Sequence, residues 1–444
     1  MTVNLQTCLQ AWQTLLGDEH VVVDEEKLQA IQTATYATTQ RVPAIIRPGN
    51  RPGVQECVKI ANQYHMPIYP ISAEKNWGYG SRVPVRDGCV ILDLGCLNRI
   101  VDYNEKLAYV SVEPGVTQEQ LFEFLQQQQS MWLMPKPKFY QFFWYILEQD
   151  AQLEVLIENL RELRLTDVLK TTFVLTNDYR TISMRSQYPW AEAQGQTPLP
   201  DALRRKLRAD AGSWFGEGAL YSADEKQSEV ERQLIQQAIE ASGAAFYYYN
   251  EELATFSNNQ LQVLFPTVDF DQVDRDQVDQ WYRENFNRGY PNDSSIKMTY
   301  WRKKQDWPAQ MAPDRDQCGL FWVVPSLPFE AIAVREAVSI VEKIALAYQY
   351  EPSIGLNCVS ARHIDMTAAI VYDREQGGED ERALTCFDEM MKQLMQAGYY
   401  PYRLNTHLME TLPTPDDDYN KVIDVLKRAL DPNNILAPGR YDFR

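Results

Sequence analysis

A six-residue stretch, KNWGYG at residues 75–80, gathers the residue types that an anion-binding loop needs. Gly78 and Gly80 allow the backbone to turn tightly and to approach a ligand closely. Successive backbone N–H groups in such a turn form a concave anion site, to which Asn76 adds a side-chain donor and Lys75 a positive charge. The stretch therefore predicts a pyrophosphate-binding loop, and an ordinary tight turn with an exposed tryptophan is the alternative.

Strands and helices alternate around this loop. Three short strands are predicted, at 43–48, 67–72 and 89–94. The residues after Pro52 predict a helix, since Val54, Val58 and Ala61 fall on one helical face. RIVDY and LAYVSV, joined by the turn NEK, predict a hairpin. A capping box from Thr117 to Gln120 then begins another helix.

The rest of the chain also mixes strands with helices, which predicts the α+β class. A strand, an amphipathic helix and a second strand are expected within 138–180, and a loop with a surface helix within 188–215. An apolar run predicts a buried strand at 319–325. The other expected elements are helices at 224–241, 329–348, 379–397 and near 417–429, and a strand at 366–373.

Composition narrows the class of protein. The chain has 444 residues, enough for two or three domains, and 45% of them are hydrophobic. The net charge of −18 disfavours nucleic acid as a partner, whereas it suits a basic protein or simply a well-solvated surface. No secretory leader and no bilayer-length apolar run is seen, so we expect a cytoplasmic protein that does not cross a membrane.

The spacing of the cysteines and histidines and the missing motifs argue against several other classes of protein. The seven cysteines are odd in number and show no CxxC or zinc-type spacing, which favours reduced, buried thiols. The four histidines never pair at i, i+3 or i+4. The patterns HExxH, GxSxG, GxxxxGK[ST] and GxGxxG are all missing, which argues against a zincin, a hydrolase, a P-loop protein and a Rossmann dinucleotide-binding protein.

The order of the segments resembles one family throughout most of the chain. PAIIRP, PIYPIS, KNWGYGSRVP, CVILDLGC and LAYVSVEPGVTQEQL resemble the FAD-binding half of the vanillyl-alcohol oxidase and p-cresol methylhydroxylase flavoproteins. MWLMPKP, GALYS and CGLFWVVPSLPF resemble blocks of that family's cap domain, and PYRLNTHL and ALDPNNILAPGRYD resemble its C-terminal return. The last two are closer to p-cresol methylhydroxylase than to vanillyl-alcohol oxidase.

The resemblance implies a fold and three segments. Residues 1–130 would be the first part of a p-cresol methylhydroxylase-type (PCMH-type) FAD-binding domain, and 131–398 a cap domain whose antiparallel sheet is flanked by helices. Residues 399–444 would return to the FAD domain.

The resemblance also implies a flavin site. The loop would wrap the FAD pyrophosphate, with cofactor contacts from eight residues: Ser72, Lys75, Asn76, Trp77, Gly78, Gly80, Gly115 and Arg403. A plain hairpin end is the alternative for Gly115.

For catalysis the resemblance implies Tyr79, Tyr402 and Arg403, with His363 near the substrate. Two phenol hydroxyls and a permanent guanidinium charge form a preorganised site for a phenolate oxygen. A hydride would leave the benzylic carbon of a para-substituted phenol for the flavin. From position alone, the alternatives are a surface pair for Tyr402 and Arg403, and a structural role for His363.

This chain departs from the family pattern at three places. Glu74 replaces a glycine and would crowd and repel a pyrophosphate unless it turns outward to Lys75. The position of covalent FAD attachment falls near Leu320, which offers no His or Tyr, so FAD is expected to be held non-covalently; Cys318 is the alternative tether.

The third departure is a missing block. Between residues 130 and 131 the family has the second half of the FAD domain, on the order of a hundred residues, including a carboxylate near the flavin. No other carboxylate stands out in the sequence as its substitute. Activity is therefore in doubt, and a non-catalytic binding module or an unstable fragment is the alternative to an enzyme. The resemblance implies a phenolic substrate, with oxygen or a cytochrome as electron acceptor. The missing block would expose the helix after Thr117, so a second subunit that covers it, in a homo-oligomer, is also expected.

Overall fold

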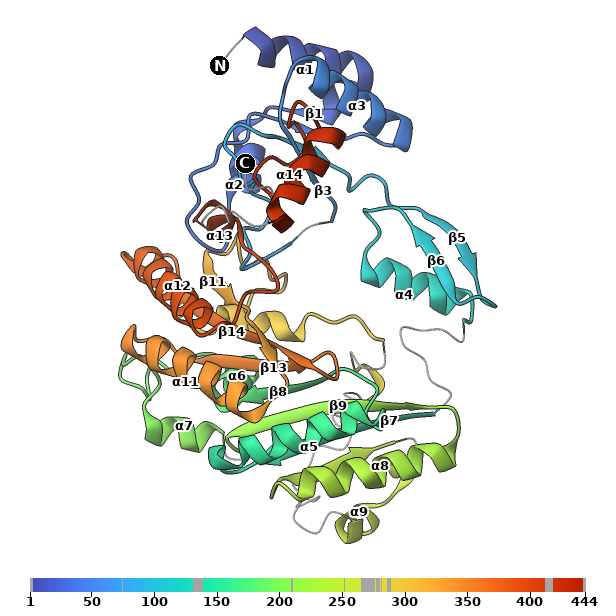
Figure 1. Ribbon diagram of the computed structural model, residues 1–444, viewed down its shortest axis with the longest axis vertical. Coiled ribbons are helices and arrows are strands. Elements are labelled where there is room, and N and C mark those ends of the chain that lie inside the picture. Colours follow the sequence, from blue (N-terminus) through green and yellow to red (C-terminus); the bar gives the residue numbers. More distant parts are fainter. Residues whose placement is uncertain are drawn as a thin grey trace.

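The computed structural model describes residues 3–441, except 74, 131–138, 209–210, 251, 265–275, 277–279, 281, 286–288 and 412–417. Figure 1 shows two layers of structure along the long axis: the N-terminal elements with the C-terminal helix α14 at one end, and a broad sheet with its helices at the other. A hairpin with one helix stands beside them.

The N-terminal part is a four-stranded sheet in the order β1-β2-β4-β3. Its strands are β1 (Val21–Val22), β2 (Ile45–Ile46), β3 (Ile68–Ile71) and β4 (Val90–Asp93), and β4 runs parallel to both β2 and β3. Its helices are α1 (Val3–Leu16), α2 (Glu25–Gln32) and α3 (Arg51–Gln63). Strands β2, β3 and β4 and helix α3 confirm the predicted elements, whereas β1, α1 and α2 were not predicted.

The C-terminal end of the chain joins this sheet. The helix α14 (Asp418–Leu430) leads to a segment that lies along β3. The N–H of Ile68 donates to the carbonyl of Ile435 at 2.7 Å, and Ile68 and Leu436 form a parallel bridge. Ile435 is buried in the same apolar core as Trp12 and Cys57. The sheet is therefore completed by residues more than 300 positions away in the sequence.

A two-stranded hairpin and a helix follow β4. The strands are β5 (Ile100–Asn104) and β6 (Tyr109–Val112), and the helix is α4 (Gln118–Gln127). Thr117 caps α4 as predicted, because its Oγ1 accepts from the N–H of Gln120 at 3.1 Å. The second half of the capping box is wrong: the Gln120 amide donates to the carbonyl of Asn98 instead of returning to Thr117.

The large sheet has eight antiparallel strands. Its order is β10-β7-β9-β8-β13-β14-β11, with β12 paired to β14. The strands are β7 (Phe139–Leu147), β8 (Phe173–Asn177), β9 (Trp214–Ser222), β10 (Ala245–Tyr249), β11 (Cys318–Val323), β12 (Ser326–Pro328), β13 (Ser353–Cys358) and β14 (His363–Asp373). The antiparallel sheet is as expected, although β9, β10 and β13 were not predicted and β14 begins three residues earlier than the predicted strand.

The two faces of this sheet differ in character. Four helices cover one face: α5 (Leu153–Leu165), α8 (Glu225–Glu240), α11 (Ala331–Ala347) and α12 (Glu379–Gln396). Side chains alternate across a strand, so the other face carries a different row of residues. The strand register places five of them side by side on that face: Asp365, Asn357, Val174, Glu217 and Trp144. Polar and charged groups therefore gather on the face away from these helices.

The other described α-helices are short: α6 (Asp178–Arg185), α7 (Asp201–Leu207), α13 (Thr406–Thr411) and, at the far edge, α9 (Asn258–Leu264). The predicted surface helix of 188–215 is α7. Helix α6 lies on the polar face of the large sheet, because a Cβ on Gly355 would come within 3.3 Å of the Arg180 side chain.

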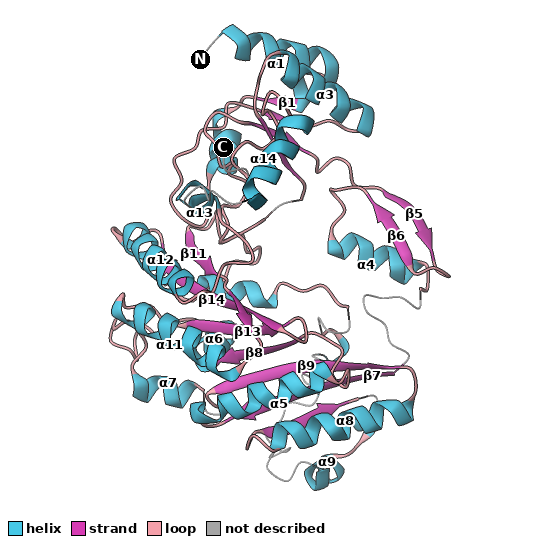
Figure 2. Cartoon of the chain, viewed as in Figure 1, coloured by secondary structure: helices cyan, strands magenta, loops and turns pink. Residues whose placement is uncertain are grey.

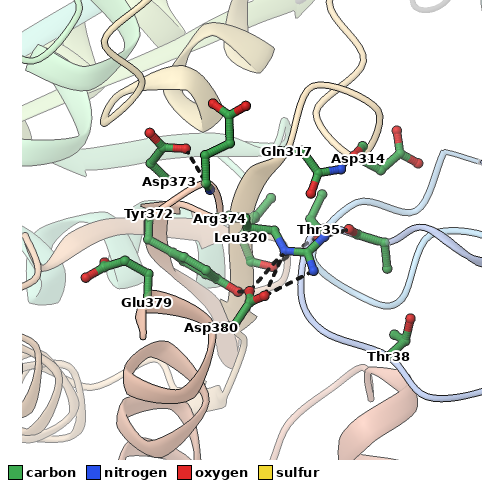
Figure 3. Close-up of polar contacts among 12 residues, drawn as sticks. Thr35, Thr38, Asp314, Gln317, Leu320, Tyr372, Asp373, Arg374, Glu379 and Asp380 are labelled. Carbon is green, nitrogen blue, oxygen red and sulfur yellow. Dashed lines mark hydrogen bonds and ion pairs between the residues drawn. The ribbon is translucent and has the colours of Figure 1, made fainter. Parts of the chain in front are cut away.

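A segment after α2 fastens the N-terminal part to the large sheet (Figure 3). The N–H of Leu320 donates to the carbonyl of Thr35 at 2.8 Å, and the Thr35 hydroxyl donates to the carbonyl of Leu320 at 3.1 Å. Arg374 donates to the carbonyl of Ala34 at 2.7 Å while it pairs with Asp380 at 2.9 Å. Strand β11 thus lies where the two parts of the chain meet.

Candidate functional site

The KNWGYG loop follows β3 and is shaped by its glycines. Gly78 has φ +80° and Gly80 has φ +111°, values that L side chains rarely adopt. A Cβ on Gly78 would lie 2.1 Å from the Trp322 ring, and a Cβ on Gly80 would lie 2.6 Å from Thr406 Oγ1. The glycines therefore let the loop approach β11 and the start of α13, in addition to any ligand.

The loop keeps several hydrogen-bond donors uncommitted. The N–H of Gly78 donates to Thr35 Oγ1 at 2.8 Å, whereas among the described residues the N–H groups of Trp77 and Gly80 have no partner. Three buried side-chain donors in and beside the loop also lack a partner there: Trp77 Nε1, Ser81 Oγ and Asn405 Nδ2. Such orphaned donors are costly unless a ligand or water accepts their hydrogen bonds. The loop can therefore receive an anionic group.

The other residues that were predicted to contact the cofactor differ in their surroundings. Lys75 Nζ lies 5.6 Å from the centre of the Trp77 ring. Ser72 comes directly after β3, where its carbonyl lies near Gly95. Gly115 is explained by packing, because a Cβ there would lie 2.5 Å from the carbonyl oxygen of Gly95; this supports the hairpin-end alternative. Glu74 lies outside the described residues.

Tyr79, Tyr402 and Arg403 come together as the sequence predicted. Backbone hydrogen bonds hold them there: the N–H of Tyr402 donates to the carbonyl of Val324 at 3.1 Å, and the N–H of Thr406 to that of Tyr79 at 3.2 Å. The phenols of Tyr79 and Tyr402 lie close enough for each to act on the pKa of the other. The Arg403 guanidinium lies 4.2 Å from the centre of the Tyr79 ring and donates to Asn76 Oδ1.

The electrostatics of this pair follow from its burial. Tyr79 is buried, and desolvation followed by the neighbouring Tyr402 raises the pKa of its phenol well above the ordinary value. Tyr402 is 45% exposed, yet desolvation of its hydroxyl end still raises its pKa, while the nearby charges of Arg403 and Arg180 oppose the rise. Both hydroxyls are therefore protonated donors at neutral pH.

Arg180 is a site residue that the sequence analysis missed. It lies in the first turn of α6, with its guanidinium 5.1 Å from the centre of the Trp322 ring and one hydrogen bond to the carbonyl of Thr367 at 3.3 Å. Burial lowers the pKa of Arg180 to about 10, while Tyr402 and Tyr79 act in the opposite direction. Within the described residues no carboxylate pairs with it. Nothing in the local sequence around 180 signals this placement.

His363 lies at the start of β14 and reaches the site through a carboxylate. Its Nε2 is 3.7 Å from Asp365 Oδ1, and its Nδ1 hydrogen-bonds with Ser360 Oγ at 2.6 Å. Asp365 in turn acts electrostatically on Tyr402. The sequence analysis identified His363 but not Asp365, although the two stand two residues apart and so share one face of the strand.

Strand β11 shows no covalent tether for a cofactor. Leu320 and Cys318 are both buried. Burial raises the pKa of the Cys318 thiol far above its usual range, which makes a reactive thiolate unfavourable. Within the described residues no cluster of three His, Cys, Asp or Glu side chains is arranged to hold a metal ion. No helix in that part of the chain is long and apolar enough to cross a membrane.

Comparisons with known proteins match this chain to FAD-binding proteins. The FAD binding domain family model (FAD_binding_4) matches residues 42–141. The chain is 34% identical, over 534 aligned residues, to the 1'-carboxy-chondrochloren decarboxylase of Chondromyces crocatus, covering all of this chain and 98% of that protein. It is 23% identical to the 4-cresol dehydrogenase [hydroxylating] flavoprotein subunit of Pseudomonas putida, covering 97% of this chain and 94% of that one.

Solved structures show the same fold. p-Cresol methylhydroxylase with substrate bound superposes with a TM-score of 0.83 at 22% identity, covering all of this chain and 97% of that chain. The 4-ethylphenol oxidase of Gulosibacter chungangensis gives 0.85 at 20% identity, with 100% and 98% coverage. From the end-to-end match to the Chondromyces protein and the matching fold, the chain belongs to the PCMH-type flavoprotein family, whose cofactor is FAD.

Proposed function

We propose that this chain is an FAD-dependent oxidoreductase that removes a hydride from the benzylic carbon of a para-substituted phenol. One observation carries the proposal: the phenols of Tyr79 and Tyr402 lie close enough to act on each other's pKa, and the Arg403 guanidinium lies 4.2 Å from the centre of the Tyr79 ring. This arrangement provides two donors and a positive charge at one point, which is what a phenolate oxygen needs.

The FAD would be held by the loop and its surroundings. The N–H groups of Trp77 and Gly80, which have no partner among the described residues, fit the oxygens of a pyrophosphate together with Ser81 Oγ and Asn405 Nδ2. When bound, the flavin supplies the acceptor for the hydride. We propose that it is held non-covalently, because Leu320 offers no nucleophile and the Cys318 thiol is buried.

The chain's own side chains would bind and polarise the substrate. Tyr79 and Tyr402 donate to the phenol oxygen, and the charges of Arg403 and Arg180 favour its phenolate form. Loss of a hydride from the para carbon is easiest from a phenolate, because the oxygen's negative charge flows into the ring as the hydride departs. Binding that stabilises the phenolate therefore lowers the barrier to oxidation.

The relatives support a phenolic substrate. Which para side chain it carries must be found by experiment. The Pseudomonas relative is a 4-cresol dehydrogenase, and the Chondromyces relative is a decarboxylase. A carboxylated para side chain is therefore a substrate to test beside a simple 4-alkylphenol. As electron acceptor we propose oxygen or a basic cytochrome, the second of which the net charge of −18 would attract.

A second candidate, a non-catalytic member of the family, is favoured by the length of the alignment. The alignment with the Chondromyces protein extends over 534 positions, although this chain has 444 residues. About 90 positions of that alignment therefore hold no residue of this chain, which is the size expected of the block that the sequence analysis places after residue 130. On the hairpin before that point, Val101 and Leu107 are 63% and 68% exposed, as expected of a surface that has lost its cover.

The absorbance spectrum of the purified protein distinguishes the two candidates. Flavin that acid precipitation releases into the supernatant would support a functional, non-covalent FAD site. Anaerobic mixing with a 4-alkylphenol should then bleach the flavin, and Tyr79→Phe and Arg403→Ala should slow the bleaching by about 100-fold each. A folded protein that takes up no added FAD would contradict the proposed enzyme activity and favour the non-catalytic binding module.

A further inference from the structure

We propose that Asp365 is the proton acceptor of this site, receiving the phenol proton through Tyr402 and passing it to His363. The inference rests on the proposed function and names a carboxylate for the role that the block missing after residue 130 would otherwise leave unfilled.

Backbone pairing places Asp365 and Tyr402 on either side of the segment 324–326. Strand β12 pairs with β14 so that Ser326 lies opposite Asp365, and the Ser326 hydroxyl is 3.5 Å from Asp365 Oδ1. On its other side this segment holds the C-terminal chain: the N–H of Ser326 donates to the carbonyl of Tyr400 at 2.8 Å. The N–H of Tyr402 donates to the carbonyl of Val324, two residues before Ser326. Asp365 and Tyr402 therefore flank the same short stretch of backbone.

Phenol oxidation needs such an acceptor. The phenol oxygen must give up its proton before the benzylic C–H electron pair leaves with the hydride, because the hydride is lost most easily from the phenolate and the product is the quinone methide. The proton passes from the substrate to Tyr402, whose own hydroxyl proton moves to the Asp365 carboxylate. The net result is one hydride removed from carbon and one proton delivered to Asp365, which balances the two-electron oxidation.

His363 connects this carboxylate with solvent. The imidazole Nε2 lies 3.7 Å from Asp365 Oδ1, and the His363 side chain is 44% exposed against 20% for Asp365. Ser360 Oγ bonds the opposite ring nitrogen and fixes the ring orientation. An exposed imidazole beside a less exposed carboxylate is suited to release the proton to water.

Few of the described charged groups act on Asp365 and Tyr402. Asp365 faces His363 on its own strand, and the pKa of the Asp365 carboxyl is raised by burial against the opposing charge of His363. The groups packed around it from β12 and β13 are the uncharged Ser326 and Asn357. Beyond them, Tyr402 faces Tyr79, Arg403 and Arg180.

The other carboxylate on this sheet face is too distant to compete. Glu217 is separated from Asp365 by Asn357 on β13 and Val174 on β8. Three strand spacings of about 4.8 Å place the two carboxylates about 14 Å apart. Glu217 is absent from the charges that act on Tyr402, whereas Asp365 is among them. Glu217→Gln is therefore the matched control for Asp365→Asn.

A titration tests the geometry without any cofactor chemistry. The protein is labelled with tyrosine carrying carbon-13 at Cζ, and Tyr402→Phe assigns the Tyr402 resonance. Because the Asp365 charge raises the pKa of Tyr402, Asp365→Asn should move the Tyr402 titration to lower pH. Glu217→Gln should leave it in place. An unchanged Tyr402 titration in Asp365→Asn overturns the inference.

Rapid mixing of the FAD-loaded protein with a 4-alkylphenol tests the proton transfer. Asp365→Asn should slow flavin bleaching by about 100-fold at neutral pH and remove the acid limb of its pH profile, whereas Asp365→Glu should restore much of the rate. Equal rates and pH profiles in wild type and Asp365→Asn overturn the inference alone. A wild-type protein that binds FAD but is bleached by no phenol overturns the proposed function and the inference with it.

Discussion

The contact between Gly78 and Trp322 should control both the stability of the protein and its cofactor site. In Gly78→Ala the new Cβ would lie 2.1 Å from Trp322 Cδ1, far inside the ordinary contact distance. The residue would also keep φ near +80°. Both the backbone and the ring must therefore shift to accept a single methyl group.

The expected magnitude is the sum of two costs. Placing an L side chain in the left-handed region costs about 1–2 kcal/mol. Overpacking against the indole costs about 1–3 kcal/mol more, and the displaced ring loosens its contact with Arg180. Gly78→Ala should therefore destabilise the protein by about 2–5 kcal/mol in urea unfolding followed by circular dichroism, and weaken FAD binding measured by fluorescence titration.

Gly88→Ala is the matched control, because Gly88 has φ +77° and nothing within 4 Å of its added Cβ. It should cost about 1–2 kcal/mol and leave FAD affinity unchanged. Replacing Trp322 by Leu in the Gly78→Ala background should reduce the cost of Gly78→Ala to that of the control. Equal destabilisation by Gly78→Ala and Gly88→Ala would refute the argument that the indole ring restricts position 78.

Two further predictions concern stability. Burial raises the pKa of Glu217 from 4.5 to about 7, so the folded protein keeps this proton to a higher pH than the unfolded chain and loses stability as the pH rises from about 4.5 to 7. Glu217→Gln should therefore add up to about 3 kcal/mol at pH 8 and little at pH 4.5 in urea unfolding; the same gain at both pH values would contradict this. Arg374→Ala removes the hydrogen bond to Ala34 and the pair with Asp380, and should cost about 2–3 kcal/mol by the same assay. Lys59→Ala, at an exposed helical pair, should cost less than about 0.5 kcal/mol, and equal losses in the two variants would show that the Arg374 contacts are not stabilising.

Part of the site was predictable because the signal is local. A glycine-rich loop after a short apolar strand identifies itself by composition, and Gly78, Gly80 and Asn76 do adopt positive φ. The order of segments predicted FAD as cofactor and the antiparallel cap sheet. Tyr402 and Arg403 were placed beside Tyr79 by resemblance to a family, since no local pattern relates residues more than 300 positions apart.

Other elements of the fold were missed where the local pattern is weak. The strands β9, β10 and β13 owe their form to neighbours in the sheet, and their glycines and aromatic runs do not alternate clearly. Gly216 and Gly218 in β9 are examples. A Cβ on Gly216 would clash with the Tyr145 ring of β7, and a Cβ on Gly218 would clash with the Phe143 ring. Glycine lowers strand propensity, yet here the cross-strand aromatic ring requires it.

The sequence by itself determined the family and the cofactor through the order of its segments, and it indicated the glycine-rich loop through its residue types. Only the tertiary structure decided that Trp322 lies against Gly78, that the Arg180 guanidinium lies over the Trp322 ring, and that Asp365 and Tyr402 flank the segment 324–326. The physical reason is that burial and electrostatic partnership depend on strand register and on contacts between distant segments. Such contacts have no period or spacing along the chain from which they could be inferred.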